Sequence, residues 1–443
     1  MLEQADVLIV GGGAAGLAAA NRLSAEGLDV ILLEGRKRLG GRIDTMHDPA
    51  WPLPIERGAE FIHGKPPETW RIAEAGGACL YDLINQHWVY ARGRLRKRDD
   101  FFAQVEKGLA VTEKVGEEDL SFDKAVKRFA GRADKESRRF ARAYVEGFDA
   151  ADARLVSSRW LAMAQAAADK IEGERLFRLN AGYDRIIKVL CTGVSNTGAH
   201  IKCASVVRRV RWGGDRVEVE AIHEGERRIY HATAVVLTVP LGVLQLQPGE
   251  EGHIAFDPPL PRGKTDGLAM LAMGPVVKVL LRFREPFWEN DVSDLDFFHC
   301  PGAAFPTWWT TLPLRSSVLT GWAGGPAAAA LTGKSEEEIL TLAAATLSRV
   351  LRVTRSTIDR LLAGAHVADW HAEPLSRGAY SYALAGGSDG ARKLAAPVGG
   401  ALFFAGEATD AAQAGTVAGA LASGQRVANE VLRHAAKKRP RSR

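Results

Sequence analysis

The first pattern along the chain is a pair of short, unbroken apolar runs near the N-terminus. Residues 7–10 read Val-Leu-Ile-Val and residues 30–33 read Val-Ile-Leu-Leu, with no polar residue among them. Runs of this kind are typical of strands buried on both faces of a parallel sheet. The segment between them opens on glycines and continues with small and apolar residues that suit a helix packed on a sheet. Residues 5–35 therefore predict a strand, a glycine turn, a helix and a second strand.

A related pattern lies near the C-terminus. The apolar run from Leu402 to Phe404 predicts a short strand, and a loop separates it from a helix that begins at about Thr416. Between the two ends of the chain, apolar and polar residues alternate within residues 216–231, and Gly225 stands at the expected turn. This pattern predicts an antiparallel hairpin. On the last helix, apolar or small residues recur at i, i+3, i+4 and i+7 and predict one buried face: Val417, Ala420, Leu421, Gly424, Val427, Ala428 and Val431.

The glycines of the first turn form a dinucleotide-binding fingerprint. Gly11, Gly13 and Gly16 give the spacing G-x-G-x-x-G where the strand meets the helix, and Glu34 stands at the end of the second strand. In this motif the glycines allow a tight turn, a close approach of the backbone to a pyrophosphate, and close packing of the helix on the strand. The acid binds a ribose hydroxyl. The alternative is a glycine turn that only packs a βαβ unit, and the terminal acid disfavours it.

Composition and charge add the protein class. The 443 residues, 46% hydrophobic and 25% charged, fit a soluble protein of two domains. No apolar run is long enough to cross a membrane and the N-terminus lacks a secretory signal, so we expect a cytoplasmic protein with no membrane partner. Five of the 58 basic residues lie in the last seven positions. The formal net charge of +5 therefore reflects a basic tail, and we expect no nucleic acid partner.

The cysteines are scattered along the chain. Their spacing matches neither a disulfide framework nor a metal cluster, so we expect no metal site. Four buried thiols are the simplest interpretation: Cys79, Cys191, Cys203 and Cys300.

Segments beyond the fingerprint carry a resemblance to a known family. In "GRKRLGGRIDT", Gly40, Gly41 and Arg42 offer a flexible turn and a guanidinium for a second contact with the pyrophosphate. With these residues, the chain resembles the flavin-dependent amine oxidases, which include monoamine oxidases, polyamine oxidases and lysine-specific histone demethylases. Further matching segments follow in the family's order along nearly the whole chain: residues 56–64, 232–244, 254–264, 276–288 and 399–432.

The resemblance implies an α/β fold with two domains. A Rossmann-like FAD-binding domain of the glutathione-reductase type would be interleaved with an α+β substrate domain. The chain has no internal repeat and no room for the long coiled-coil insertion of the histone demethylases, which disfavours a role on chromatin. The expected division is residues 1–65, 180–265 and 392–434 for the FAD domain, 66–179 and 266–391 for the substrate domain, and 435–443 for a basic tail.

The resemblance also implies which residues hold FAD. It places the pyrimidine edge of the flavin at the N-terminus of the last helix, where the positive dipole end would stabilise the reduced form. Val207 matches a residue that contacts adenine, although a core valine is a competing interpretation. Ala379 stands where monoamine oxidases have the cysteine that bonds the flavin, so we expect noncovalent FAD. The expected cofactor-binding set is Gly11, Gly13, Ala14, Ala15, Gly16, Glu34, Gly35, Arg36, Gly40, Gly41, Arg42, Gly58, Ala59, Glu60, Phe61, Val207, Trp370, Tyr380, Gly406, Glu407, Thr416 and Val417.

Aromatic residues between 370 and 382 are candidates for the substrate site. By resemblance, Trp370 and Tyr380 line the face of the flavin, where rings exclude water and attract an ammonium group. The alternative is that they fill the core of a strand. Thr416 occupies the position of the second tyrosine of the monoamine oxidase cage. In this departure the chain resembles polyamine oxidases and histone demethylases instead. Tyr382 is expected on the same strand face as Tyr380, and no role is assigned to it.

Polar candidates for catalysis are fewer. Lys278 lies on an apolar strand with Val276 and Leu280 on its own face, so an exposed position fits it poorly. By resemblance it holds a water near flavin N5. His63 matches a substrate contact of polyamine oxidases. Glu60 is an acid that would attract a cation, but it is expected on the opposite strand face from His63, so His63 is preferred.

The function that the resemblance implies is FAD-dependent oxidation of an amine. A hydride would pass from the carbon next to the nitrogen to flavin N5, the imine would hydrolyse, and O2 would reoxidise the flavin and yield hydrogen peroxide. An L-amino-acid oxidase or a desaturase on the same fold is an alternative and would use an arginine such as Arg315 or Arg377 for a substrate carboxylate. A protein that binds FAD without turnover is the alternative of another class.

Overall fold

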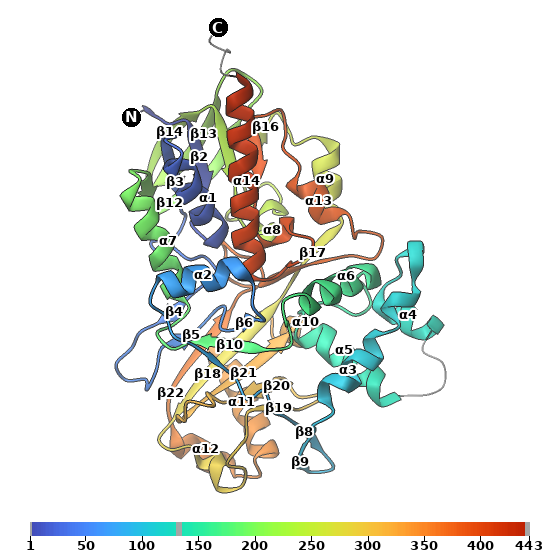
Figure 1. The fold of residues 1–443 in the computed structure, drawn as a ribbon. Coiled ribbons are helices and arrows are strands. Elements are labelled where there is room, and N and C mark those ends of the chain that lie inside the picture. Colours follow the sequence, from blue (N-terminus) through green and yellow to red (C-terminus); the bar gives the residue numbers. More distant parts are fainter. Residues whose placement is uncertain (1, 130–134, 439–443) are drawn as a thin grey trace.

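The computed structural model of the protein describes residues 2–129 and 135–438 (Figure 1). A five-stranded sheet in the order β11-β3-β2-β15-β24 forms the centre of one part, and all its neighbouring strands are parallel. The strands predicted at 7–10, 30–33 and 402–404 are confirmed with these bounds. The five strands are β2 (Val7–Val10), β3 (Val30–Leu33), β11 (His200–Lys202), β15 (Ala234–Leu237) and β24 (Leu402–Phe404).

Helices cover one face of this sheet. Helices α1 (Ala14–Ala25) and α14 (Val417–Lys438) lie side by side in Figure 1, with α7 (Asp184–Asn196) on the other side of α1. Gly424 of α14 allows this close packing, because a Cβ atom there would lie 2.4 Å from the carbonyl oxygen of Ala15. Helix α14 begins within one residue of the predicted start, and the face predicted to be buried packs into the core of this layer.

A second sheet covers the opposite face. Its strand order is β1-β14-β13-β12-β16, and the hairpin predicted at residues 216–231 is confirmed in β13 and β14. Apolar side chains of both sheets share one core, for example Leu8 and Phe404 with Val219 and Tyr230. This is the expected Rossmann-like arrangement. The strands are β1 (Leu2–Gln4), β12 (Ser205–Arg211), β13 (Val217–His223), β14 (Glu226–Ala232) and β16 (Ala255–Asp257).

A seven-stranded sheet forms the core of the other part of the molecule. Its order is β22-β18-β21-β20-β19-β8-β9, and helices α11 (Glu336–Val350) and α12 (Arg355–Leu361) lie against it below the first part (Figure 1). Successive side chains of β18 point to opposite faces of the sheet, so that Val277 and Val279 face the helical core while Lys278 faces the opposite way. The sheet strands are β8 (His87–Ala91), β9 (Arg94–Lys97), β18 (Val276–Phe283), β19 (Phe297–His299), β20 (Thr307–Trp309), β21 (Val318–Gly324) and β22 (Leu362–Asp369).

The remaining elements connect and cover these layers. The helices are α2 (Pro67–Ala75), α3 (Phe101–Leu109), α4 (Phe122–Phe129), α5 (Lys135–Gly147), α6 (Ser158–Asp169), α8 (Leu241–Leu244), α9 (Arg262–Ala269), α10 (Gly325–Ala329), α11 (Glu336–Val350), α12 (Arg355–Leu361) and α13 (Gly390–Ala395). The short strands are β4 (Thr45–Met46), β5 (Ile55–Glu56), β6 (Ile62–His63), β7 (Leu80–Asp82), β10 (Leu176–Leu179), β17 (Leu271–Gly274) and β23 (Tyr380–Ala383). The division of the chain between two domains stays a prediction.

Some sequence expectations need correction. The interpretation of all cysteines as buried thiols is wrong, since only Cys300 is buried, while Cys79 is exposed and Cys191 and Cys203 are partly exposed. The end of the basic tail lies outside the described residues. Among residues 2–129 and 135–438, no helix is long and apolar enough to cross a membrane, and no group of metal-binding side chains is present.

Candidate active site

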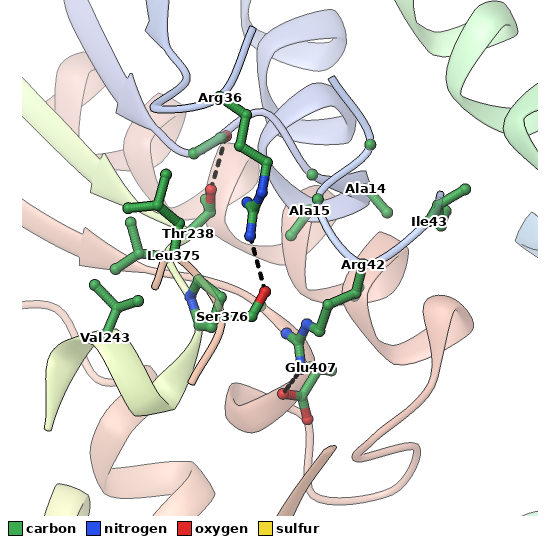
Figure 2. Close-up of a pocket in the computed structure, with 18 of the residues that line it drawn as sticks. Ala14, Ala15, Arg36, Arg42, Ile43, Thr238, Val243, Leu375, Ser376 and Glu407 are labelled. Carbon is green, nitrogen blue, oxygen red and sulfur yellow. Dashed lines mark hydrogen bonds and ion pairs between the residues drawn. The ribbon is translucent and has the colours of Figure 1, made fainter. Parts of the chain in front are cut away.

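A large cavity opens at the carboxyl ends of the parallel strands, as is usual for ligand sites in such sheets. It leaves about 1210 Å³ free of protein atoms, including the open solvent at its mouth. Figure 2 shows side chains from both ends of the chain that point into it. Of the predicted site residues, the structure places these in its lining: Gly11, Gly13, Ala14, Ala15, Glu34, Gly35, Arg36, Gly40, Gly41, Arg42, Gly58, Ala59, Val207, Trp370, Tyr380, Gly406, Glu407, Thr416 and Val417.

The glycine turn after β2 has the geometry of a phosphate cradle. Gly11 adopts a φ of 111°, and Gly16 packs so tightly that a Cβ atom would lie 1.9 Å from the carbonyl oxygen of Gly11. At Gly13, in contrast, the nearest atom to such a Cβ is 3.9 Å away, which leaves the backbone open to a ligand. Helix α1 starts here without a side-chain cap, so its first N–H groups are free for an anion.

Glu34 lies in the cavity lining at the end of β3 and organises the backbone around it. Its buried carboxylate accepts hydrogen bonds from the backbone nitrogens of Gly12 at 2.7 Å and Arg36 at 2.8 Å, through different oxygens. Each oxygen keeps a further lone pair for a ribose hydroxyl. Arg36 extends across the cavity to the hydroxyl of Ser376 at 2.9 Å (Figure 2) and pairs with Glu373, which ties the segment after β22 to the end of β3.

Arg42 and Glu407 form an ion pair at the other end of the cavity. The guanidinium donates to Glu407 at 2.8 Å and to the carbonyl of Ala379 at 2.6 Å (Figure 2). The second carboxylate oxygen of Glu407 accepts hydrogen bonds from the Ser381 hydroxyl at 2.6 Å and from the backbone nitrogen of Gly415 at 3.0 Å. The pair therefore fixes the backbone on both sides of Tyr380. The predicted contact of Arg42 with the pyrophosphate stays a prediction.

Thr416 lines the cavity as the cap of α14. Its hydroxyl donates to the carbonyl of Gln413 at 2.8 Å and accepts from the backbone nitrogen of Gly419 at 2.9 Å. With both hydrogen bonds inside its own turn, the side chain shapes the helix start, and other backbone N–H groups there remain available to an anion. The expectation that Thr416 replaces the second tyrosine of the monoamine oxidase cage stays a prediction.

Three aromatic rings form the far wall of the cavity. Trp370 is fixed by a hydrogen bond from its ring nitrogen to the carbonyl of Arg57, 3.0 Å away. Tyr380 stacks with Trp322, with ring centroids 6.0 Å apart and planes at 23°, and burial raises the pKa of the Tyr380 phenol. Both predicted rings thus reach the ligand space instead of only filling the core. Tyr382, in contrast, packs into the core and does not line the cavity.

Lys278 is buried as predicted but lies behind the cavity wall. Its ammonium donates to a carboxylate oxygen of Glu60 at 2.7 Å and to the carbonyl of Glu56 at 2.5 Å, and the carbonyl of Gly58 lies 3.4 Å away. Gly58 itself lines the cavity. The lysine is therefore one residue layer from the ligand space, and its predicted water near flavin N5 stays a prediction.

Glu60 belongs to this buried charge network. Arg178 also pairs with it at 2.7 Å, and the ring nitrogen of Trp309 donates to it at 3.0 Å. Burial alone would raise the pKa of Glu60, but Lys278 and Arg178 together lower it below the ordinary value. The structure does not bring Glu60 into the large cavity. The predicted cofactor contact of Glu60 therefore finds no support in the geometry.

Phe61 and His63 also lie outside that lining. Phe61 packs against Trp309 with ring centroids 5.4 Å apart, and His63 packs edge-on against Phe148 at 5.1 Å. We expected Glu60 and His63 on opposite faces of one strand. This expectation is wrong, because the strand comprises only residues 62 and 63 and Glu60 lies outside it. Burial lowers the pKa of His63 to about 4, and its Nδ1 atom has no hydrogen-bond partner among the described residues.

The sequence analysis missed several residues of the lining. Thr238 closes the glycine turn by donating to the carbonyl oxygen of Gly11 at 2.9 Å (Figure 2). Trp322 lies opposite Lys278 in the pairing of β21 with β18, a register that the sequence alone does not give. Other missed lining residues include Ile43, Ser205, Val206, Val239, Pro240, Val243, Gly252, Ile254, Leu375, Ser376, Gly415 and Ala420. The sequence contained a signal for Thr238, because this residue directly follows the apolar run 234–237. Gly11 follows the apolar run 7–10 in the same way.

Neither arginine proposed for a substrate carboxylate lines this cavity. Arg315 is largely exposed and pairs with Glu289 at 2.7 Å. Arg377 donates to the carbonyl of Glu251 at 2.9 Å. The geometry therefore gives no support to recognition of an amino acid carboxylate by either residue.

Comparison with known proteins gives the family of the chain. The family model "Flavin containing amine oxidoreductase" matches residues 14–432. The chain is 29% identical to human Lysine-specific histone demethylase 2, in a match that covers 96% of this chain and 53% of that protein. It is 27% identical to Arabidopsis thaliana Polyamine oxidase 2, in a match that covers 96% of this chain and 87% of that protein. It thus spans about half the length of the demethylase. A putrescine oxidase structure with putrescine bound shares the fold, with a TM-score of 0.80, 21% identity, and coverage of 98% of this chain and 100% of that one.

The residues present fit the cofactor of this family. A glycine turn at a helix N-terminus, a buried acid at the end of a parallel strand and a set of aromatic rings line one cavity, and these are the groups that would hold FAD. The family match covers nearly the whole chain. The chain belongs to the family of flavin-containing amine oxidoreductases.

Proposed function

We propose that the protein is an FAD-dependent oxidase of a small amine, either polyamine-like or another primary or secondary amine. The observation that carries this proposal is the position of Trp322, Trp370 and Tyr380 at one end of the dinucleotide cavity. Such rings bind the apolar chain of an amine and attract its cationic form. Family membership, the polyamine oxidase relatives and the putrescine oxidase fold add support.

The roles of the residues follow from their contacts. When bound, FAD would supply the redox chemistry, taking a hydride from the carbon next to the amine nitrogen and passing electrons to O2, so that the imine hydrolyses and hydrogen peroxide forms. Glu34 would bind a ribose hydroxyl, and the free N–H groups of α1 would bind phosphate. Tyr380 and Trp322 would orient the amine and exclude water from it, since their stacked rings close the end of the cavity.

The other candidate reactions receive less support. An L-amino-acid oxidase would need a free guanidinium near the rings, but Arg42 is paired with Glu407 and Arg178 with Glu60. A protein that keeps FAD without turnover would have no use for an open aromatic wall. Both alternatives are tested by the same experiment.

A peroxide-coupled substrate screen of the purified, FAD-loaded protein tests the proposal. The panel comprises putrescine, a longer polyamine, cyclohexylamine, benzylamine and L-amino acids. We expect peroxide with at least one amine and none with the amino acids. Anaerobic mixing with each compound separates the two half-reactions, because bleaching of the yellow colour without peroxide in air would indicate a dehydrogenase. Absence of bleaching with every amine would overturn the proposal.

A further inference from the structure

The loop between β22 and β23 reaches from the seven-stranded sheet back to the dinucleotide cavity. It comprises residues 370–379. The backbone nitrogen of Gly378 donates to the carbonyl of Trp370 at 2.7 Å, so the two ends of the loop lie together. Near its tip, the backbone nitrogen of Arg377 donates to the carbonyl of Glu373 at 2.9 Å. The loop is therefore a compact unit that is closed at its base.

Two side chains of this loop form part of the cavity wall. Leu375 and Ser376 both line the cavity. Leu375 packs on Gly35, since a Cβ atom on that glycine would lie 2.8 Å from the Cδ1 atom of the leucine. Gly35 directly follows Glu34, the acid that binds a ribose hydroxyl in this motif. The loop thus closes the wall of the cavity beside the ribose-binding acid.

Side chains attach the loop to the dinucleotide-binding part at two places. Arg36 forms an ion pair with Glu373, and it also donates to the hydroxyl of Ser376 at 2.9 Å (Figure 2). At the second place, Arg377 of the loop donates to the carbonyl of Glu251 at 2.9 Å. The loop is therefore held on the cavity by two separate segments of the chain.

The ion pair between Arg36 and Glu373 has the properties of a reversible attachment. The Arg36 side chain is 14% exposed and lines the cavity, whereas the Glu373 side chain is 32% exposed and does not line it. An ion pair at such a partly exposed position contributes a modest free energy, so it can break and reform. Local opening of a loop also costs less free energy than global unfolding. Each break of the pair therefore gives the loop an opportunity to leave the cavity wall.

We propose that Glu373 is a positioning residue that latches this loop on the cavity and so slows the release of FAD. Through Arg36, the latch keeps Leu375 and Ser376 in the wall beside Glu34. This inference goes beyond the proposed function, because it concerns retention of the cofactor and needs no oxidation of an amine. A competing role predicts the opposite effect. If Glu373 only neutralises Arg36, its removal frees the guanidinium for the phosphates of FAD and slows release.

Exchange of bound FAD measures the latch. The holoprotein is mixed with an excess of isotopically labelled FAD, and mass spectrometry of the protein-bound fraction over time gives the dissociation rate. We expect Glu373→Gln to raise this rate about fivefold, the upper end of what a partly exposed ion pair contributes. Arg377→Met removes the attachment to Glu251 and leaves the charge of Arg36 unchanged, so it should raise the rate as well.

Glu289→Gln is the matched control for loss of an ion pair. Glu289 pairs with Arg315 at 2.7 Å, is partly exposed like Glu373, and lies outside the lining of the cavity. This substitution also replaces a paired glutamate by glutamine, so any general effect of the lost charge appears in it. We expect its FAD dissociation rate to equal that of the wild type.

Hydrogen exchange gives a second readout, which separates a latch from a general loss of stability. The backbone nitrogens of Ser376 and Arg377 donate within the loop, so their exchange in D2O reports its opening. In Glu373→Gln these amides should exchange faster than in the wild type. The amides of the central strand β2 should exchange at the wild-type rate.

The outcomes decide between the two roles of Glu373. Faster release of FAD from both loop variants, with faster exchange confined to the loop, supports the latch. Release from Glu373→Gln at the wild-type rate or more slowly overturns it, as does faster release from Glu373→Gln without any from Arg377→Met. Faster exchange in β2 as well overturns it, because Glu373 would then support the whole fold. All these results leave the proposed function standing, since only the amine screen tests it.

Discussion

The ammonium nitrogen of Lys278 lies 2.7 Å from a carboxylate oxygen of Glu60, where the lysine is fully buried and the Glu60 side chain is only 11% exposed. The lysine expected beside the flavin is therefore one half of an ion pair, whose other half also holds Arg178. A buried pair of this kind gives little net stability compared with apolar residues, but removal of one partner leaves an uncompensated charge.

Loss of the Glu60 charge should destabilise the protein strongly. Glu60→Gln leaves Lys278 and Arg178 facing each other without a counter-ion, so we expect the free energy of unfolding to fall by about 3 kcal/mol or more. Urea unfolding of the holoprotein measures it. Glu172→Gln is the control, because that exposed glutamate pairs with Lys65 at the surface and should cost at most about 1 kcal/mol. Equal losses in the two variants would contradict a special role for the buried network.

Lys278 should act mainly in the reaction with oxygen. Lys278→Met keeps the length and apolar stem of the side chain but removes its charge, which would otherwise stabilise the negative charge that O2 acquires. Stopped-flow measurements should show reoxidation by O2 slowed about tenfold or more, which corresponds to about 1.4 kcal/mol, with reduction by the amine changed far less. If both steps slow equally, Lys278 only shapes the site. If reoxidation is unchanged, the role expected from the resemblance is wrong.

Much of the first part of the fold was predictable from the sequence, because its signals are local. The apolar runs at 7–10, 30–33 and 402–404 each encode a fully buried strand, and the glycine spacing encodes the turn. Most other expected lining residues came from the family resemblance, whereas the same local patterns indicated Gly11, Gly13 and Glu34, which line the cavity. These positions depend on where strands end, which short-range patterns reveal.

The aromatic wall and the buried charges were less predictable, because they depend on strand pairing between distant segments. Trp322 reaches Tyr380 through the register of β21 with β18, and Glu60 meets Lys278 across a separation of 218 residues. Alternation alone placed Tyr382 on the same face as Tyr380, but the short strand β23 leads it into the core.

The FAD should be released by denaturation. Ala379 borders the cavity and has no nucleophile, so no bond to the flavin is expected at this position. Acid precipitation of the holoprotein should leave the yellow colour in the supernatant. Flavin that stays with peptides after proteolysis of the pellet would show that a different residue forms a covalent bond.

Tyr380 should affect substrate oxidation more than folding. Tyr380→Ala opens the wall next to Trp322, so the amine is oriented less well, and we expect anaerobic reduction of the flavin to slow at least tenfold with FAD content nearly unchanged. Tyr382→Phe is the control two residues away, because its ring lies in the core. A loss of stability without a slower reduction would mean that Tyr380 is only a core residue.

A stacked histidine pair should make the protein sensitive to acid. Nδ1 of His87 and Nε2 of His299 lie 2.9 Å apart, and both rings stack on Phe101. Burial lowers the pKa of His299 to about 4, and burial together with His299 lowers the pKa of His87 well below its ordinary value. Neither ring takes up a proton at neutral pH, because a charge in this apolar stack would have no counter-ion.

The sign of the pH effect follows from proton uptake. Between pH 6.5 and about 4, a histidine of the unfolded chain binds a proton that the folded His299 does not, so unfolding takes up protons and the free energy of unfolding falls as the pH falls. One such group contributes up to about 1.4 kcal/mol per pH unit. Urea unfolding of the holoprotein at several pH values from 7.5 to 4.5 should show this decline, and His299→Gln should make it less steep. A decline of the same slope in the variant would mean that carboxylates such as Glu60, whose pKa Lys278 and Arg178 lower, cause the acid sensitivity instead of the histidine pair.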